Sequence, residues 1–232
     1  MTPYLDAVLF GIFPYIALVV LAVGSVLRYE REPYSWRSGS SQLLRRRQLI
    51  WGSALFHIGV LIVFFGHLAG LLVPVEMFHL FGIEPPTKQI MAIVVGGVAG
   101  AIALIGGVML LHRRLIDPRI RKTSSVGDIA VLALLDLQLA LGLAGIFVSL
   151  EHLDGSMMLA FMAWAQGIFT FDLDAWRFVA EAHWLFKLHI LLGLLLFVMF
   201  PFTRLVHMLS APLRYLYRPG YQIVRSKRTG PA

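Results

Sequence analysis

The chain is organised as long apolar runs separated by short polar segments. Uncharged runs of roughly 20 residues, the length that a helix needs to cross a bilayer, cover about 7–27, 49–75, 90–111 and 129–150. A fifth run, at about 185–209, carries Lys187 and His189 near its start and Arg204 and His207 near its end. Basic side chains at such positions extend to the membrane interface. The pattern predicts an all-α membrane protein with five transmembrane helices and its termini on opposite sides of the membrane.

Composition supports a lipid environment. The sequence is 58% hydrophobic and 14% charged, whereas a soluble domain carries about 25% charged residues. The chain contains no cysteine, which excludes disulfides, thiolate metal sites and ligation of an iron–sulfur cluster by this chain. A redox metal would therefore need histidine ligands.

The basic residues predict the orientation. Only Lys88, Arg177 and Lys187 fall on one predicted side. The other side receives seventeen of the 20 Lys and Arg residues, namely Arg28, Arg31, Arg37, Arg45, Arg46, Arg47, Arg113, Arg114, Arg119, Arg121, Lys122, Arg204, Arg214, Arg218, Arg225, Lys227 and Arg228. Because basic residues are retained on the cytoplasmic side, we expect the C-terminus in the cytoplasm and the N-terminus outside. This distribution explains the net charge of +7 without nucleic acid as a partner.

The segment 151–184, between the fourth and fifth runs, is more polar. Its apolar stretch, 157–171, is too short to cross a bilayer, so we predict an outer loop that contains an interfacial helix or a lid. A sixth span here would place the basic end of the chain outside, against the charge distribution. We therefore expect a single transmembrane domain over 1–232, which ends in a basic cytoplasmic tail at 210–232.

Four histidines lie within two of the predicted spans, where polar side chains are costly and call for a functional reason. His57 and His67 are on the second predicted helix, and His189 and His207 are on the fifth. Since the second helix runs outward and the fifth inward, depth pairs His57 with His207 near the inner face and His67 with His189 near the outer face. Two histidines can hold a haem iron between them and leave no open coordination position, which suits electron transfer.

The spacings within the two helices do not match on straight helices. Ten residues separate the histidines of the second helix and eighteen those of the fifth, which correspond to about 15 Å and about 27 Å along a helix. We expect tilt or a bend in the second helix to reconcile them. Glycine is common at plain helix contacts in membranes, but it would also let a flat ring approach the backbone. Glycines near the histidines are Gly59, Gly66, Gly70 and Gly193.

Other metals and other functions stay open on these residues alone. Zinc and copper also bind histidine, but two histidines at each depth are fewer than those metals generally recruit. A small transporter or channel with a histidine-lined pathway is an alternative of a different class. It predicts more polar residues within the spans than this sequence has.

Several further polar side chains are candidates for a role. Asp136, inside the fourth predicted helix, could relay protons, or it could bond a neighbour such as Gln138 or a haem edge, and we favour the structural role. Arg113 and Arg114 could pair with haem propionates or could be ordinary residues of the cytoplasmic side. The remaining ones are expected to be solvated or interfacial, namely Glu151, His152, Asp154, Glu181, His183, His79 and His112.

Short motifs along almost the whole chain carry a family resemblance. They are Phe-Pro-Tyr-Ile-Ala from Phe13, Leu-Arg-Tyr from Leu27, Ser-Ser-Gln from Ser40, Leu-Phe-His-Ile-Gly from Leu55, Gly-His at Gly66, Lys-Gln at Lys88, Trp-Ala-Gln at Trp164, Leu-His at Leu188 and Arg-Leu-Val-His from Arg204. With the histidine spacings of ten and eighteen, the sequence resembles the gamma subunit, or cytochrome b subunit, of membrane-bound respiratory nitrate reductase. Asp136 departs from the apolar residue expected in that family.

The resemblance implies two b-type haems. The inner haem would be held by His57 and His207 and the outer haem by His67 and His189. This assignment agrees with the pairing by depth.

The resemblance also implies a function in a complex. The subunit would oxidise a membrane quinol, menaquinol or ubiquinol, beside the outer haem, at a site that includes Lys88, Gly66 and His67. It would pass electrons to a cytoplasmic iron–sulfur beta subunit and on to a molybdenum-containing alpha subunit that reduces nitrate. Its location would be the cytoplasmic (inner) membrane of a prokaryote, as a multi-pass protein. The alternative within this class is the haem b subunit of a related reductase complex of sulfur metabolism.

Overall fold

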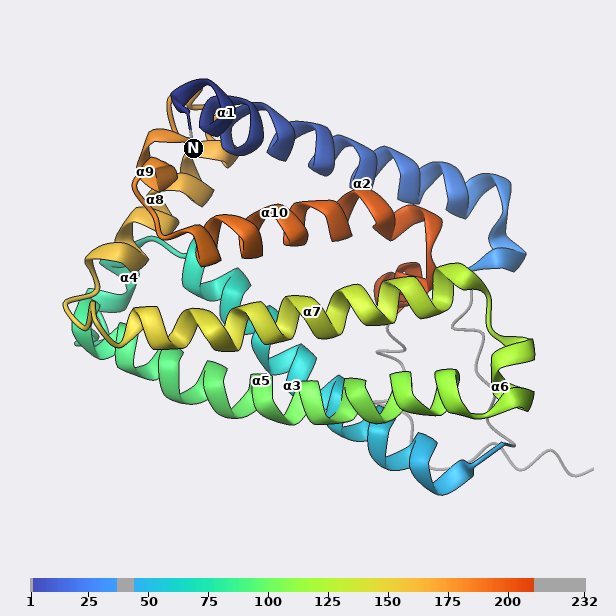
Figure 1. Cartoon of the computed structure of the whole chain (residues 1–232). Coiled ribbons are helices and arrows are strands. Elements are labelled where there is room, and N and C mark those ends of the chain that lie inside the picture. The colour runs from blue at the N-terminus through green and yellow to red at the C-terminus, as the bar shows by residue number, and fades with distance from the viewer. Residues whose placement is uncertain (1, 37–43, 211–232) are drawn as a thin grey trace, which may run out of the picture.

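The computed structural model describes residues 2–36 and 44–210, and all regular secondary structure in these ranges is helical. Among the described residues, five helices are long and apolar enough to cross a membrane. They are α1–η1–α2 (Pro3–Ala7, Val8–Ile12 and Phe13–Arg31), α3 (Arg46–Leu72), α5 (Pro85–Ile116), α7 (Val126–Ser149) and α10 with η3 (Trp184–Met199 and Phe200–Phe202). The prediction of an all-helical fold with five candidate spans is confirmed (Figure 1).

The predicted tail at 210–232 lies outside the described residues apart from Ser210. Arg37 and the Ser-Ser-Gln motif from Ser40 also lie outside them.

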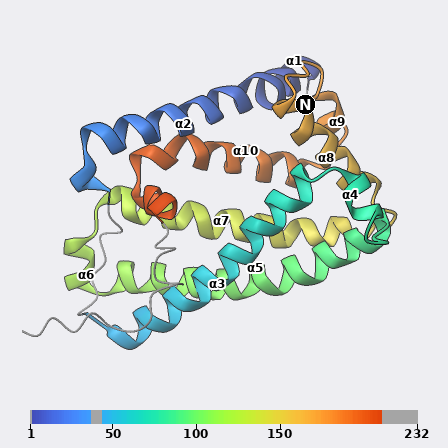
Figure 2. The same ribbon diagram turned by 180° about the vertical axis from the view of Figure 1, so that it is seen from behind.

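The long helices pack as a series of neighbours, with α3 against α5, α5 against α7, α7 against α10 and α10 against α2. Figures 1 and 2 both show α3 crossing the other helices obliquely. A Cβ on Gly59 would lie 2.5 Å from the carbonyl oxygen of Ala99, and a Cβ on Gly106 would lie 2.3 Å from the amide nitrogen of Phe56. Gly59 and Gly106 therefore permit the close contact between α3 and α5. Of the two roles considered above for Gly59, the structure shows the helix–helix contact.

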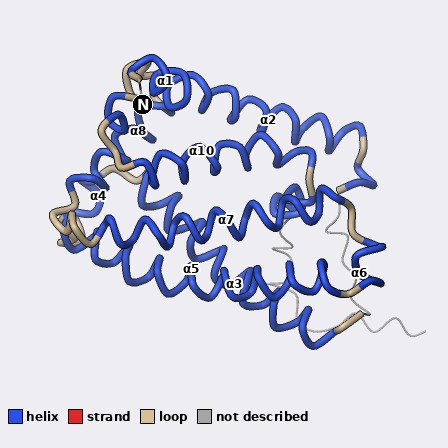
Figure 3. Tube along the Cα trace, viewed as in Figure 1, coloured by secondary structure: helices blue, strands red, loops and turns tan. Residues whose placement is uncertain are grey.

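Short elements cover the two ends of the bundle, where the loops also gather (Figure 3). One end, which we call the α8 end, holds α4 (Val75–His79), α8 (Ser156–Phe169), α9 (Arg177–Ala180) and the start of α1. The other end, the α6 end, holds η2 (Pro33–Ser35), α6 (Pro118–Thr123) and η4 (Arg204–Ser210). With 14 residues, α8 is shorter than a membrane span.

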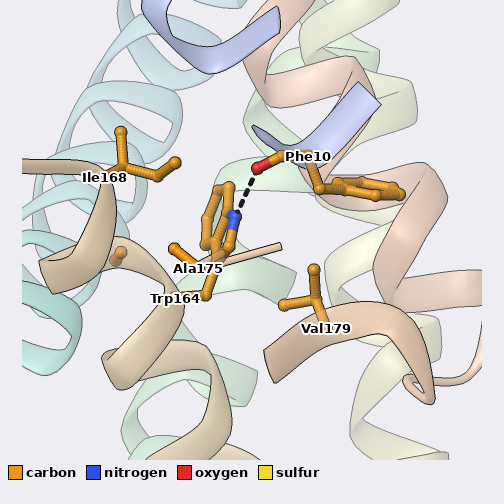
Figure 4. Close-up of a cluster of buried hydrophobic side chains, with 6 residues drawn as sticks. Phe10, Trp164, Ile168, Ala175 and Val179 are labelled. Atoms are coloured by element: carbon orange, nitrogen blue, oxygen red, sulfur yellow. Dashed lines mark hydrogen bonds between the residues drawn. The ribbon is translucent and has the colours of Figure 1, made fainter. Parts of the chain in front are cut away.

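A π-helical turn within the first span makes a contact with α8. In such a turn the backbone departs from the regular α-helical hydrogen-bond ladder. Within this turn, η1, the carbonyl oxygen of Phe10 accepts the indole N–H of Trp164 at 2.9 Å (Figure 4). Phe10 and Trp164 belong to a buried apolar cluster with Ile168, Ala175 and Val179. The first helix, α8 and the segment before α10 therefore share one core.

A buried ion pair lies at the same end. The Lys187 ammonium on α10 is 2.9 Å from the Asp6 carboxylate on α1, and both side chains are more than 90% buried. The ammonium also donates to the carbonyl oxygen of Ala180 at 2.5 Å. Since charged groups are rarely buried unless paired, this contact fixes the start of α10 against the N-terminal helix.

The fifth span ends earlier than the apolar run predicts. The α-helix α10 gives way to the 3-10 turn η3, then to an extended Thr203, and then to η4, which carries His207. Pro201 lies in this break, and proline interrupts a helix because it has no amide hydrogen and its ring displaces the preceding turn. Arg28 of α2 donates to the carbonyl oxygens of Pro201 and Thr203, both at 2.7 Å. The chain therefore stops being an α-helix well before residue 209, the expected limit of the span.

Candidate functional site

Two pairs of histidine rings lie close together, each with one ring from α3 and the other from α10 or from η4 after it. The ring of His57 on α3 lies with its centroid 6.3 Å from that of His207 on η4. The ring of His67, further along α3, lies 6.0 Å from that of His189 on α10. The structure therefore brings the four histidines together in the two pairs expected from their depths.

The separation of the rings fits a metal ion within each pair. A metal–imidazole bond is about 2 Å long and each ring nitrogen lies roughly 1 Å from the ring centre, so two histidines on opposite sides of one metal have ring centres about 6 Å apart. The observed 6.3 Å and 6.0 Å match this value. No group of three or more histidine, aspartate or glutamate side chains that could hold a metal is found among the residues that the structure describes. A site with two histidines per metal is thus the one that these residues fit, as in a six-coordinate haem.

Three of the four histidines have one ring nitrogen occupied by a backbone carbonyl. The Nδ1 of His57 is 2.7 Å from the carbonyl oxygen of Ser53, and the Nδ1 of His67 is 2.8 Å from that of Val63. The Nδ1 of His207 contacts the carbonyl oxygen of Arg204. An Nδ1–H that donates to a carbonyl leaves the lone pair of Nε2 for a metal.

Several polar contacts at the α6 end hold His207 in place. Arg28 fixes the carbonyls on either side of the break at Pro201, as described above. Arg204 pairs with Asp128 of α7 at 2.8 Å, and Val206 is fully buried beside His207.

The α-helix ends between His189 and His207, so the straight-helix estimate for their spacing does not apply, while α3 remains one continuous α-helix that runs obliquely. The expected tilt of the second helix is present. The break in the fifth helix was missed, although Pro201 in the run was the signal that could have indicated it.

Open space lies beside the pair at the α8 end. A Cβ on Gly66 or Gly70 would meet no atom within 4 Å, so this face of α3 has room for a large flat ring. A Cβ on Gly142 of α7 would instead lie 3.1 Å from Cε1 of His189, and a Cβ on Gly193 would lie 3.2 Å from Nε2 of Gln138. Gly142 and Gly193 therefore let His189 and Gln138 pack against neighbouring helices.

Lys88 is buried at the start of α5, close to this pair. Its ammonium is 3.0 Å from the carbonyl oxygen of Gly70, 3.0 Å from the sulfur of Met162 on α8, and 3.7 Å from the ring centroid of Phe78. Gly70 follows His67 by less than one helical turn. The structure thus places the Lys88 ammonium against α3 about one helical turn beyond Gly66 and His67. Its charge is met by one carbonyl, one weak thioether acceptor and one aromatic face.

Asp136 lies on α7 in the contact between α3, α5 and α7. The side chain is buried, and a Cβ on Gly107 of α5 would come within 1.8 Å of its Oδ1. Neither carboxylate oxygen has a hydrogen-bond partner among the described residues. The predicted bond to Gln138 is therefore not formed, because Gln138 turns to His189 on another helix.

The other polar candidates have structural contacts. His183 caps the start of α10, and Arg113 and Arg114 donate to the carbonyl oxygen of Leu44 and to the hydroxyl of Ser124. The remaining contacts join His79 to Glu84, His112 to Gln48, His152 to the Val148 carbonyl and Asp154 to Ser156. The hydrogen bonds from the hydroxyl and the backbone N–H of Ser156 lower the pKa of Asp154.

Together these features define the class of protein, an all-helical membrane protein in which two pairs of histidine rings lie close together at two levels, with one ring of each pair on α3 and the other on α10 or on η4 after it. A sequence model of the family described as nitrate reductase gamma subunit matches residues 6–227. The chain belongs to this family, which confirms the resemblance found in the sequence, and it is accordingly a subunit of an oxidoreductase complex.

Individual relatives agree with this family. The chain is similar to the respiratory nitrate reductase 2 gamma chain of Escherichia coli (strain K12), with 46% identity over 98% of this chain and 100% of that protein. It is similar to the nitrate reductase gamma chain of Bacillus subtilis (strain 168), with 40% identity over 95% of this chain and 98% of that protein. The nitrate reductase-like protein NarX of Mycobacterium tuberculosis (strain ATCC 25618 / H37Rv) is 32% identical over 93% of this chain, but the match covers 33% of that longer protein.

Proposed function

We propose that this chain is the di-haem cytochrome b subunit of a nitrate reductase complex in the cytoplasmic membrane. In this role it oxidises quinol near the outer face and passes electrons through two b haems to a cytoplasmic iron–sulfur subunit. A molybdenum-containing subunit then reduces nitrate. The observation that carries the proposal is the pair of facing histidine rings at each of two levels, 6.3 Å and 6.0 Å apart.

The histidines supply the axial ligands in this proposal. His57 and His207 hold one haem, and His67 and His189 hold the other. A haem between two histidines supplies one-electron transfer without an open coordination position. The Nδ1 contacts of three of these rings support the role, since they keep Nε2 available for iron.

The charge distribution supports an orientation with the α6 end in the cytoplasm. The described part of this end and the loops that adjoin it carry Arg28, Arg31, Arg45, Arg46, Arg47, Arg113, Arg114, Arg119, Arg121, Lys122 and Arg204. The α8 end carries Lys88, Arg177 and Lys187. By the positive-inside rule, His57 and His207 are then the inner pair, His67 and His189 are the outer pair, and the N-terminus is outside.

Lys88 binds the quinol in this proposal. Among the described residues no carboxylate pairs with its buried ammonium, which contacts a carbonyl oxygen, a thioether sulfur and an aromatic ring. A quinol oxygen is a stronger acceptor than a thioether sulfur, so it would replace Met162 at the ammonium. Gly66, the residue before His67, has open space beside it on α3. The quinol protons leave at the outer face and the electrons move inward, so turnover generates a membrane potential.

The test uses the intact complex under anaerobic conditions. Added menaquinol or ubiquinol should reduce the b-type absorption bands, and nitrate added next should reoxidise them. Bands that stay reduced with nitrate and are reoxidised by a sulfur compound would contradict the nitrate assignment and favour the sulfur-metabolism alternative. A colourless complex would contradict the haem proposal as a whole and favour a histidine-lined transporter.

A further inference from the structure

His189 is held differently from the other three histidines of the two pairs. In His57, His67 and His207, the Nδ1 atom contacts the backbone carbonyl oxygen of the residue three or four positions earlier. The Nδ1 of His189 is buried and has no hydrogen-bond partner among the described residues. Its own helix therefore leaves the orientation of this ring open.

A side chain of the neighbouring helix meets the ring instead. The Nε2 of Gln138 on α7 is 3.3 Å from the ring Nε2 of His189 and 3.1 Å from its backbone carbonyl oxygen. The residue therefore contacts both the ring and the backbone of the same histidine. It joins α7 to α10 at the level of the pair formed with His67.

The surrounding residues are shaped for this contact. Gln138 and Gly142 are four residues apart, so they lie on one face of α7. A Cβ on Gly142 would lie 3.1 Å from the His189 ring, and a Cβ on Gly193 of α10 would lie 3.2 Å from the Gln138 amide. Both glycines bring the amide and the ring together across the helix contact.

The unmet hydrogen-bonding capacity at this contact is complementary. The side-chain oxygen of Gln138 is buried without a partner, and so is Nδ1 of His189. The contact to the ring occupies Nε2, the nitrogen that a haem iron would take, so ligation of iron would release the amide from the ring while its bond to the His189 carbonyl oxygen remains. The amide oxygen would then be the acceptor for the Nδ1–H of a metal-bound His189. Such a bond fixes the ring plane and raises the basicity of the ligand.

We propose that Gln138 is the positioning residue of His189, and that it sets the redox potential of the outer haem separately from the inner one. The proposal rests on the haem ligation proposed above. In the inner pair, both histidines are held by backbone carbonyls of residues three or four positions earlier, and among the described residues no side chain of another helix has this role. A change at Gln138 therefore affects only the outer haem.

The test measures both haems in the purified complex with Gln138→Leu and Gln138→Glu. Redox titration of the b-type bands gives the two midpoint potentials, and low-temperature electron paramagnetic resonance reports the geometry of the axial ligands. Gln138→Leu removes the polar partner and should shift the outer potential upward. Gln138→Glu loses the bond to the His189 carbonyl but supplies a stronger acceptor to the ring, and it should shift the outer potential downward. The inner potential should stay unchanged in both variants.

A matched control is Gln48→Leu, which removes an amide bond of 3.0 Å from α3 to the Met109 carbonyl of α5 and should change neither haem. Loss of the outer haem alone in Gln138→Leu, with its return in Gln138→Glu, would also support the proposal. Wild-type potentials and spectra for the outer haem in both Gln138 variants would overturn it. Absence of b-type bands in the wild-type complex would instead refute the haem ligation on which it rests.

Discussion

At the scale of single residues, the histidines and Lys88 could be located from the sequence, but their partners could not. The spacing of polar side chains within apolar runs identified His57, His67, His189 and His207. Which atom each side chain contacts depends on how the helices are rotated and tilted. The thioether of Met162 beside Lys88 comes from α8, far away in the sequence, and no local pattern predicts such a contact.

Met162→Leu tests whether the thioether competes with quinol for Lys88. Removing a weak acceptor from the ammonium should favour the quinol oxygen by about 1 kcal/mol, so KM for quinol should fall by about fivefold while kcat is unchanged. Steady-state oxidation of quinol by the intact complex measures both. Met158→Leu, on the same helix, is the control and should leave KM unchanged. An unchanged or higher KM in Met162→Leu would show that the sulfur does not compete.

The partner of Asp136 could also not be predicted from the sequence. The sequence suggested a bond to Gln138, two residues later on the same helix. Residues two apart point to different faces of a helix, so Asp136 turns to α5 while Gln138 turns to α10. The relative rotation of neighbouring helices decides such partners.

At the scale of elements, hydrophobic runs predicted the five spans but not the irregular turns within them. The π-helical turn η1 and the break at Pro201 both lie inside apolar runs. The π turn leaves no compositional signal because its residues are ordinary apolar ones. The break had a signal in Pro201, but many membrane helices tolerate proline, and only the contacts of Arg28 show why the chain turns here.

Arg28→Gln tests whether the break positions His207. The guanidinium meets two carbonyls at the break, and a neutral amide would leave at least one unsatisfied at a cost of about 1–3 kcal/mol. The segment that carries His207 should then be held less firmly, so the inner haem should be partly lost and the outer haem retained. Haem content per complex, resolved by redox titration, measures this. Equal loss of both haems would indicate general misfolding instead.

At the scale of the whole molecule, the sequence predicted the fold class and the pairing of the histidines because both follow from helix number and direction. It did not predict which side chains hold the α8 end of the bundle together. The buried pair of Asp6 and Lys187 and the bond of Trp164 to Phe10 join segments that are more than 150 residues apart in the chain. Side chains of such separation meet only once the bundle is assembled.

Asp6→Asn tests the contribution of the buried pair to stability. Removing one partner leaves the Lys187 ammonium buried without its counter-charge, which should lower the free energy of unfolding by about 3–5 kcal/mol. The pair of Asp174 and Arg177 is a control because both side chains are about two-thirds exposed, so Asp174→Asn should cost less than about 1 kcal/mol. Thermal denaturation of the purified complex compares the two variants. Similar melting temperatures would mean that burial adds nothing to the Asp6–Lys187 contact.

The central claim is that each of the two histidine pairs holds one haem. The most direct measurement is a redox titration of the b-type bands in the purified complex, with His67→Ala and His57→Ala beside the wild-type chain. The account predicts two components in the wild type, loss of one in His67→Ala, and loss of the other in His57→Ala. A single component, or the same component lost in both variants, would contradict it.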